Sequence, residues 1–339
     1  MTSREIIRRV IRHNNPPRLG WDFHDERYQD IKHVWLGRLI KPGTEQYANW
    51  GDYPNLRAKA PHFNGELSMD HYGNILGRLN GITKGECVRG VIQEDWSEFE
   101  GYEFPKLNYE QAEKVKAQDL KKQDKYVLTG LPGVFSALRD MRRMENALMD
   151  VVAEPEQIEA YYQRYLPRLL EAVTLAADVG ADGVIIGDDW GMQTGPFISP
   201  AAFRDLFKPV YKAIADACHA RDVDFIFHSC GRVLPLVDDM IDAGIDCFQF
   251  DQPETSGVTM WAEQYGKKTS FYCPVDIQKI MSTGDRELIE KSALHMANEF
   301  TKNGGALIAK DYPTWFEIEV KDEWARWAMD VLVVNSAVR

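Results

Sequence analysis

The sequence places a histidine and a cysteine two positions apart, His228 and Cys230, directly after the apolar run 223–227. In an extended segment the side chains alternate between two faces, so residues two positions apart point the same way. Imidazole and thiolate both bind zinc, and a catalytic zinc usually has three protein ligands and a fourth position for water or substrate. The pair therefore predicts two ligands of a zinc site.

Reactive polar residues also follow the other apolar runs in the second half of the chain. They are Asp188, Asp189 and Trp190 after 183–187, Asp251 and Gln252 after 246–250, Cys273, Pro274, Val275 and Asp276 after 269–272, and Lys310, Asp311 and Tyr312 after 306–309. We expect Cys273 as the third zinc ligand because thiolate suits zinc, with Asp311 as the second choice. Asp188 or Asp251 could instead supply an oxygen ligand or a carboxylate that orients His228.

The same pair also fits two interpretations without a metal. His228 could be a buried histidine that packs on a structural cysteine, because free cysteine is among the most buried residue types. Cys230 could also be a nucleophile that His228 activates, since a helix starting after Gly231 would lower the pKa of the thiol. Each acid taken singly could equally be a satisfied loop carboxylate. Cys218 and Cys247 fall on predicted core positions.

The apolar runs alternate with amphipathic helices, which is typical of a parallel sheet. Strands are predicted at 183–187, 223–227, 246–250, 269–272 and 306–309, with earlier ones at 18–23 and 126–130. Helices are predicted at 155–179, from 200 to 218, at 233–243 and at 286–303. No Gly-x-Gly-x-x-Gly follows a strand, so we expect a (β/α)8 barrel rather than a doubly wound sheet. Residues 1–339 would form one domain, with about 42–125 as an elaboration over the barrel mouth.

Composition narrows the partners and the compartment. Lys and Arg number 40 against 52 Asp and Glu, so the net charge of −12 disfavours nucleic acid. No apolar run reaches the roughly 18 residues of a membrane span. Five dispersed cysteines do not form a secreted disulfide framework, so we expect a cytoplasmic protein with reduced thiols. Thr2 and Glu5 predict a capping box at the start of a short amphipathic helix.

Taken together, these residues resemble the uroporphyrinogen decarboxylase superfamily, and their organisation is more similar to its corrinoid-linked methyltransferase branch than to the tetrapyrrole decarboxylases. The segments that carry the resemblance are 2–6, 69–75, 96–105, 144–150, 187–191, 198–200 and 228–231. The resemblance implies a (β/α)8 barrel. The Arg-Gln-Ala-Gly-Arg segment of the decarboxylases, which grips substrate carboxylates, has no counterpart between Leu19 and Leu39.

In the methyltransferase branch, which includes methylcobamide:coenzyme M methyltransferases and O-demethylases, the His-x-Cys pair binds zinc together with a later cysteine near the last strands. His228 and Cys230 match this motif, but the later cysteine is not matched, because residues 309–313 read Ala-Lys-Asp-Tyr-Pro. Either Asp311 substitutes for it, or Cys273 reaches in from the preceding strand, or the site is altered.

The resemblance implies a zinc-dependent methyltransferase that moves a methyl group between a small methylated or methoxy substrate, or a thiol, and a corrinoid protein. Asp188 and Asp251 would contact substrate or orient a ligand, and Tyr312 could wall the pocket with Trp190 and Trp315. The alternatives are a metal-independent decarboxylase or lyase that uses Lys310 and Asp311, and a silent binding partner. The sequence also allows a homodimer.

Overall fold

The computed structural model describes residues 1–79 and 85–338 and contains an eight-stranded parallel sheet. Its strands lie in the order β1 (Gly20–Asp22), β11 (Leu307–Lys310), β10 (Ser270–Cys273), β9 (Cys247–Gln249), β8 (Asp224–His228), β7 (Gly183–Gly187), β6 (Tyr126–Gly130) and β2 (Ile31–Val34). The segment that leads into the edge strand β2 bonds back to the end of the other edge strand, β1, from Asp30 N to Trp21 O at 2.7 Å and from Phe23 N to Tyr28 O at 3.1 Å. The sheet is therefore a nearly closed barrel, and the predicted fold class is confirmed.

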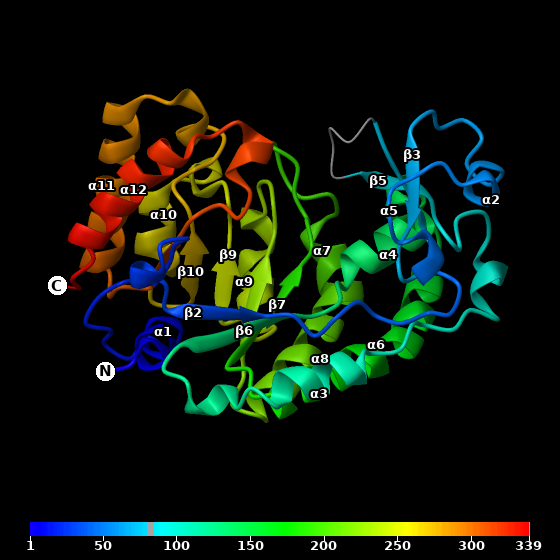
Figure 1. Cartoon of the computed structure of the whole chain (residues 1–339), viewed down its shortest axis with the longest axis horizontal. Helices are drawn as coiled ribbons and strands as arrows, with labels where there is room; N and C mark the ends of the chain where they lie inside the picture. Colours follow the sequence, from blue (N-terminus) through cyan, green and yellow to red (C-terminus); the bar gives the residue numbers. More distant parts are fainter. Residues whose placement is uncertain (80–84, 339) are drawn as a thin grey trace.

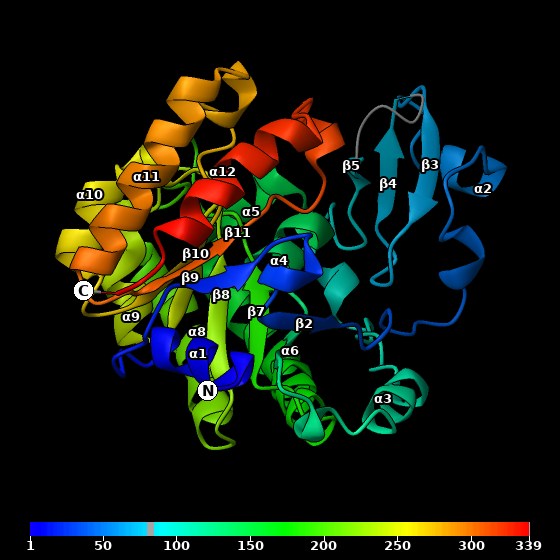
Figure 2. The same ribbon diagram turned by 60° about the vertical axis from the view of Figure 1, so that its left-hand side comes forward.

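Helices surround the barrel (Figures 1 and 2). They are α3 (Tyr109–Lys116), α4 (Phe135–Arg142), α5 (Met144–Ala153), α6 (Pro155–Asp178), α7 (Pro200–Ala202), α8 (Lys208–His219), α9 (Val237–Asp242), α10 (Val258–Met260), α11 (Arg286–Lys302) and α12 (Asp322–Val334). The helix predicted from 200 to 218 is one continuous helix, in which a π-helical turn, Phe203–Phe207, lies between α7 and α8. Pro209 explains the wide turn because it cannot donate to the carbonyl four residues earlier. No helix in the described ranges is long and apolar enough to cross a membrane.

The inside of the barrel is closed at its N-terminal end by α1 (Ser3–Ile11), which begins with the predicted Thr2 and Glu5 capping box. Four apolar side chains of α1 pack on inward-facing residues of the strands. This inner core consists of Ile6, Ile7, Val10, Ile11, Ile31, Tyr126, Leu128, Ile226, Cys247, Tyr272 and Ile308. Because side chains alternate along a strand, these residues also fix which later positions face inward toward the open C-terminal end.

The region 42–125 contains a second sheet that sequence reasoning missed. It is antiparallel and consists of β3 (Glu66–Met69), β4 (Ile75–Arg78) and β5 (Glu86–Arg89), with the short helix α2 (Pro54–Arg57) beside it. The sheet stands next to α4 and α5 (Figures 1 and 2), where Ile92 N donates to Met141 O at 3.1 Å. Strands of four residues are too short to show a clear alternating pattern, which explains the omission.

Candidate metal centre

Three potential metal ligands meet where β7 and β8 end. His228 is the last residue of β8, Cys230 follows it by two positions, and Asp189 lies in the loop after β7. His228 Nε2 is 3.5 Å from Cys230 Sγ and 3.4 Å from Asp189 Oδ1. The three ligand atoms all lie within 4.8 Å of one another, and within residues 1–79 and 85–338 no other group of three or more His, Cys, Asp or Glu does so.

The spacing of these donor atoms fits a tetrahedral zinc ion. Zinc binds sulfur at ~2.3 Å and nitrogen or oxygen at ~2.0–2.2 Å, so tetrahedral angles put sulfur and nitrogen about 3.5 Å apart and nitrogen and oxygen about 3.4 Å apart. The observed distances of 3.5 Å and 3.4 Å agree with both values. All three residues are partly exposed, which leaves room for a fourth ligand from solvent or substrate.

Two glycines bring the loops after β7 and β8 together. A Cβ atom on Gly231, which has a φ of +77°, would lie 2.1 Å from the carbonyl oxygen of Gly191. A Cβ atom on Gly191 would lie 2.7 Å from Arg232 N. Only glycine permits this close approach, and it lets Cys230 N donate to Asp189 Oδ1 at 2.8 Å. The glycines therefore position Asp189 against the His-x-Cys pair.

A chain of side chains orients His228 from behind. His228 Nδ1 hydrogen-bonds with Gln249 Oε1, Gln249 Nε2 donates to Asp251 Oδ1 at 2.7 Å, and Lys310 Nζ donates to the same oxygen at 3.1 Å. Because an amide oxygen only accepts, Nδ1 carries a proton, so Nε2 is the nitrogen that would bind a metal ion next to Asp189 and Cys230. Asp251, predicted to contact substrate or to orient His228, is connected to His228 through Gln249, which sequence reasoning missed.

The pKa shifts of the three donor residues favour a positive charge between them. Burial alone lowers the pKa of His228, but Asp189 and Cys230 raise it to about 10. Burial raises the pKa of Asp189, yet hydrogen bonding to His228 outweighs it and lowers the value to about 2. Burial also raises the pKa of the Cys230 thiol. A divalent cation would replace the imidazolium proton and the thiol proton, so its binding releases protons.

Asp188, which the sequence analysis expected to contact substrate or orient a ligand, lies outside the metal cluster and is bonded within the protein. The side chain is fully buried and accepts hydrogen bonds from Val134 N at 3.0 Å, Ser136 N at 2.8 Å and Tyr211 Oη at 2.7 Å. It therefore holds the start of α4 against β7 and α8. The physical reason is alternation along β7: Asp189 shares the inward face with Ile185 and Gly187, and Asp188 shares the outward face with Ile186.

Neither predicted third ligand lies in the cluster. Cys273 is 2% exposed and belongs to the core between the sheet and the outer helices, where burial raises its pKa to about 12. Asp311 accepts a hydrogen bond from His24 N at 2.9 Å and lies three strands away from β8 in the sheet order. Tyr312 packs its ring 5.9 Å from that of Trp315. The structure brings Asp189 to His228 and Cys230 instead.

Comparison with known proteins agrees with this architecture. The uroporphyrinogen decarboxylase (URO-D) family model matches residues 112–310, so the chain belongs to this family. A methyltransferase from Methanosarcina mazei has a similar structure, with a TM-score of 0.66 over 98% of this chain and 99% of that one at 14% identity. No curated protein matches the sequence.

Other solved structures resemble the chain less closely. A β-L-arabinopyranosidase from Geobacillus stearothermophilus in complex with arabinose gives a TM-score of 0.41 at 13% identity, covering 96% of this chain and 78% of that one. A D-psicose 3-epimerase from Clostridium cellulolyticum gives a TM-score of 0.39 at 12% identity, covering 71% and 86%. At 14% identity the similarity to the Methanosarcina mazei methyltransferase concerns the fold.

Proposed function

We propose that this protein is a zinc-dependent methyltransferase that moves a methyl group between a small methylated or methoxy substrate, or a thiol, and a corrinoid carried by a partner protein in the cytoplasm. The observation that carries the proposal is the arrangement of Asp189, His228 and Cys230 with distances that suit tetrahedral zinc. Its position at the C-terminal end of a URO-D family barrel supports it, because active sites of such barrels lie there.

Asp189, His228 and Cys230 would hold the metal, with Asp189 as the third ligand. When bound there, zinc supplies Lewis acidity that stabilises negative charge on the sulfur or oxygen that gains or loses the methyl group. Two anionic ligands and one neutral imidazole balance the charge of Zn²⁺. Gln249 and Asp251 keep His228 in the tautomer that binds, and Lys310 neutralises Asp251.

Two inward-facing glycines next to the cluster leave space for the reacting molecules. A Cβ atom on Gly130 would have no heavy atom within 4 Å, and one on Gly187 would meet only His228, at 3.7 Å. Both positions follow the alternation of inward-facing Leu128 and Ile185. We infer that the substrate and the corrinoid approach the metal ligands from the side of β6 and β7.

The direct test uses methylcobalamin as methyl donor and 2-mercaptoethanol as acceptor. We expect the zinc-loaded protein to consume methylcobalamin and form the methyl thioether faster than zinc and the reagents alone. Cys230→Ser should lose this activity, and Cys87→Ser should keep it, since Cys87 lies in the second sheet. A wild-type protein that retains no zinc when zinc is supplied, and that transfers no methyl group, would refute the proposal.

A metal-independent lyase remains the second candidate because Lys310 is buried at the barrel mouth. Its ammonium group pairs with Asp251 at 3.1 Å, and the two side chains are 5% and 8% exposed. A buried ammonium can stabilise a carbanion that forms on loss of a carboxylate. Carbon dioxide release by metal-free protein, lost in Lys310→Met and kept in Cys230→Ser, would favour this function.

A further inference from the structure

A second group of polar residues lies across the barrel from the metal cluster. Asp22 ends β1, which is four strands from β8 in the sheet order and therefore faces it across the barrel. Asp22 Oδ2 is 2.8 Å from His33 Nε2, and Tyr272 Oη donates a hydrogen bond to the same oxygen. The carboxylate is 8% exposed, whereas the imidazole of His33 is 53% exposed.

These side chains border a cavity of about 210 Å³. Its lining includes Asp22, Gln29, His33, Tyr272, Lys310 and Asp311. Tyr272 belongs to the inner core, and Asp22 and His33 each lie two positions beyond an inward-facing residue, Gly20 and Ile31 respectively. The alternation of strand residues thus points Asp22, His33 and Tyr272 into the barrel, from strands that lie four, three and two places from β8 in the sheet order.

The hydrogen-bond pattern leaves one nitrogen of His33 available. An ionised carboxylate can only accept, so His33 Nε2 carries the proton and Nδ1 presents a lone pair. Within the described ranges His33 Nδ1 makes no hydrogen bond, and half of the ring is exposed. An imidazole held on one nitrogen by a buried carboxylate and open on the other is the usual arrangement of a general acid–base histidine.

Another His and Asp pair in the molecule shows what a structural version looks like. His219 Nε2 is 2.9 Å from Asp246 Oδ2, but this pair lies where α8 ends and before β9 begins, at the closed end of the barrel. Asp246 also accepts from Phe225 N at 2.7 Å, which makes it part of the backbone connection. The pair at His33 differs because it borders a cavity at the open end.

We propose that His33 is a catalytic acid–base residue, positioned by Asp22 and Tyr272, for a small substrate that carries a thiol or hydroxyl proton. This inference rests on the proposed function. In the direction of methyl acceptance, His33 Nδ1 takes the proton, the S–H or O–H bond breaks, and the electron pair stays on sulfur or oxygen. That atom then forms the bond to the methyl group of the corrinoid, whose cobalt keeps the electron pair. The proton leaves His33 for water, and the reverse direction returns it.

The first test examines the imidazole itself and needs no activity. Long-range proton–nitrogen NMR spectra of metal-free, ¹⁵N-histidine-labelled protein report the tautomer of each ring, and His33→Gln assigns the His33 signal. We expect the Nε2–H tautomer in the wild type and a mixture of tautomers in Asp22→Asn, which keeps the size of the side chain. A predominant Nδ1–H tautomer in the wild type would overturn the inference.

The second test uses zinc-loaded protein with methylcobalamin and 2-mercaptoethanol. His33→Gln should lower kcat by ~10²–10⁴-fold, the usual contribution of acid–base catalysis, with little change in KM or in zinc content. His219→Gln is the matched control and should keep the wild-type kcat. An active wild type with an unchanged His33→Gln variant would contradict the role of His33 alone. A wild type without zinc and without transfer would remove the proposed function, and this inference with it.

Discussion

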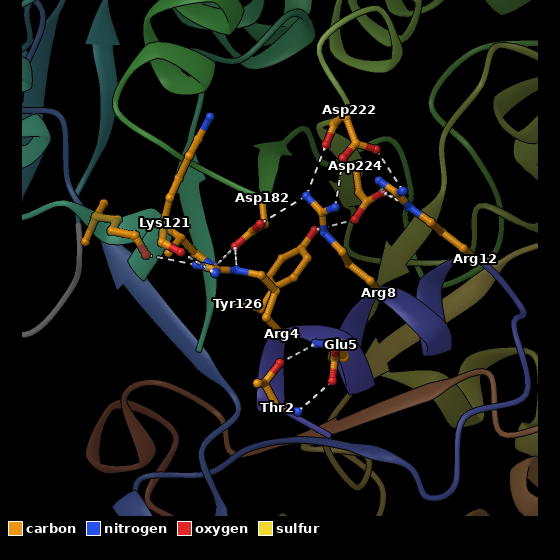
Figure 3. Close-up of polar contacts among 12 residues, drawn as sticks. Thr2, Arg4, Glu5, Arg8, Arg12, Lys121, Tyr126, Asp182, Asp222 and Asp224 are labelled. Carbon is orange, nitrogen blue, oxygen red and sulfur yellow. Dashed lines mark hydrogen bonds and ion pairs between the residues drawn. The ribbon is translucent and has the colours of Figure 1, made fainter. Parts of the chain in front are cut away.

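The two ends of the barrel use charged residues in opposite ways. At the N-terminal end, Arg4 and Arg8 of α1 and Arg12, the residue after its end, lie four positions apart and meet carboxylates at the starts of β7 and β8 (Figure 3). Arg4 pairs with Asp182 at 2.8 Å, Arg8 with Asp182 at 3.1 Å and Asp222 at 2.8 Å, and Arg12 with Asp222 and Asp224, both at 2.8 Å. Each of these charges has a partner of opposite sign, as expected where charged groups hold elements together.

At the C-terminal end, by contrast, donor atoms lie close together and can still bind a metal ion or accept a proton. His228 Nε2, Cys230 Sγ and Asp189 Oδ1 crowd within 4.8 Å, and His33 Nδ1 faces a cavity. The difference shows that one end of the barrel serves stability and the other serves chemistry. Ion pairs and the apolar side chains of α1 close the N-terminal end, whereas the possible metal ligands lie beside glycines at the open C-terminal end. Substitutions at the two ends should therefore have distinct effects.

The largest effect is expected from Cys230→Ser. Loss of a ligand should weaken zinc binding by more than the ~10–100-fold seen for residues that only orient ligands. Because Cys230 lies in a partly exposed loop, the free energy of unfolding of metal-free protein should change by only about 0.5 kcal/mol. Competition with a chelator measures the first quantity and urea unfolding the second. Unchanged zinc affinity would mean that the thiol is not a ligand.

At the closed end, Asp182→Ala should destabilise the fold by about 3 kcal/mol, because it removes the buried carboxylate that pairs with Arg4 and Arg8 and that accepts from Val127 N. Asp222→Asn is the control at Arg8: asparagine tolerates the φ of +56° at this position, and the carboxylate is 63% exposed, so its loss should cost less than about 1 kcal/mol. Urea unfolding distinguishes the two variants. Equal losses of stability in the two variants, or a loss of zinc affinity in either one, would contradict the separate roles of the two ends.

Gln249→Leu should lower zinc affinity by ~10–100-fold, because His228 would lose the acceptor that fixes its Nδ1 proton. The side chain is of similar size, so we expect folding to persist. Gln193→Leu, at an exposed glutamine whose Nε2 is 3.3 Å from Gln278 Oε1, is the matched control and should bind zinc like the wild type. If both variants bind zinc equally well, the orienting chain is not needed.

The smallest effect concerns pH and the closed end. The hydrogen bond to Asp246 raises the pKa of His219 above its ordinary value, although burial opposes the shift. A raised folded pKa means that the pair stabilises the fold fully below pH ~6.5, the ordinary histidine value, and loses this contribution as pH rises through the folded pKa. His219 is 44% exposed, so the contribution should stay below about 1 kcal/mol.

Unfolding of wild type and His219→Gln at several pH values measures this contribution. The difference in the free energy of unfolding should be largest at acidic pH and vanish at alkaline pH. A difference that grows with pH would contradict the assigned direction of the pKa shift.

The sequence was sufficient for most of the barrel because its strands are apolar and its helices amphipathic. The predicted strand 183–187 has the same bounds as β7. The predicted strand 223–227 begins and ends one residue before β8, because His228 belongs to the strand. The strand β2 escaped prediction because it reads Ile-Lys-His-Val: its second inward position carries His33, a polar residue at the open end, in place of an apolar one.

The third ligand could not be chosen from the sequence for a related reason. Strands of a closed barrel are buried on both faces, so an apolar run does not reveal which of its residues point inward. Asp188 and Asp189 are neighbours, and so are Tyr272 and Cys273; in each pair only one faces the inside. Inward-facing Tyr126, Leu128 and Tyr272, which pack with α1, identify that face only in the folded structure.

The most direct measurement is X-ray absorption fine structure at the zinc edge of the zinc-loaded wild-type protein. With Asp189, His228 and Cys230 as ligands, the first shell should contain one sulfur at ~2.3 Å, with the remaining ligands nitrogen or oxygen at ~2.0–2.2 Å. Two sulfur ligands would contradict a site in which Cys230 is the single thiolate. A shell without sulfur, or a protein that retains no zinc, would contradict the metal centre altogether.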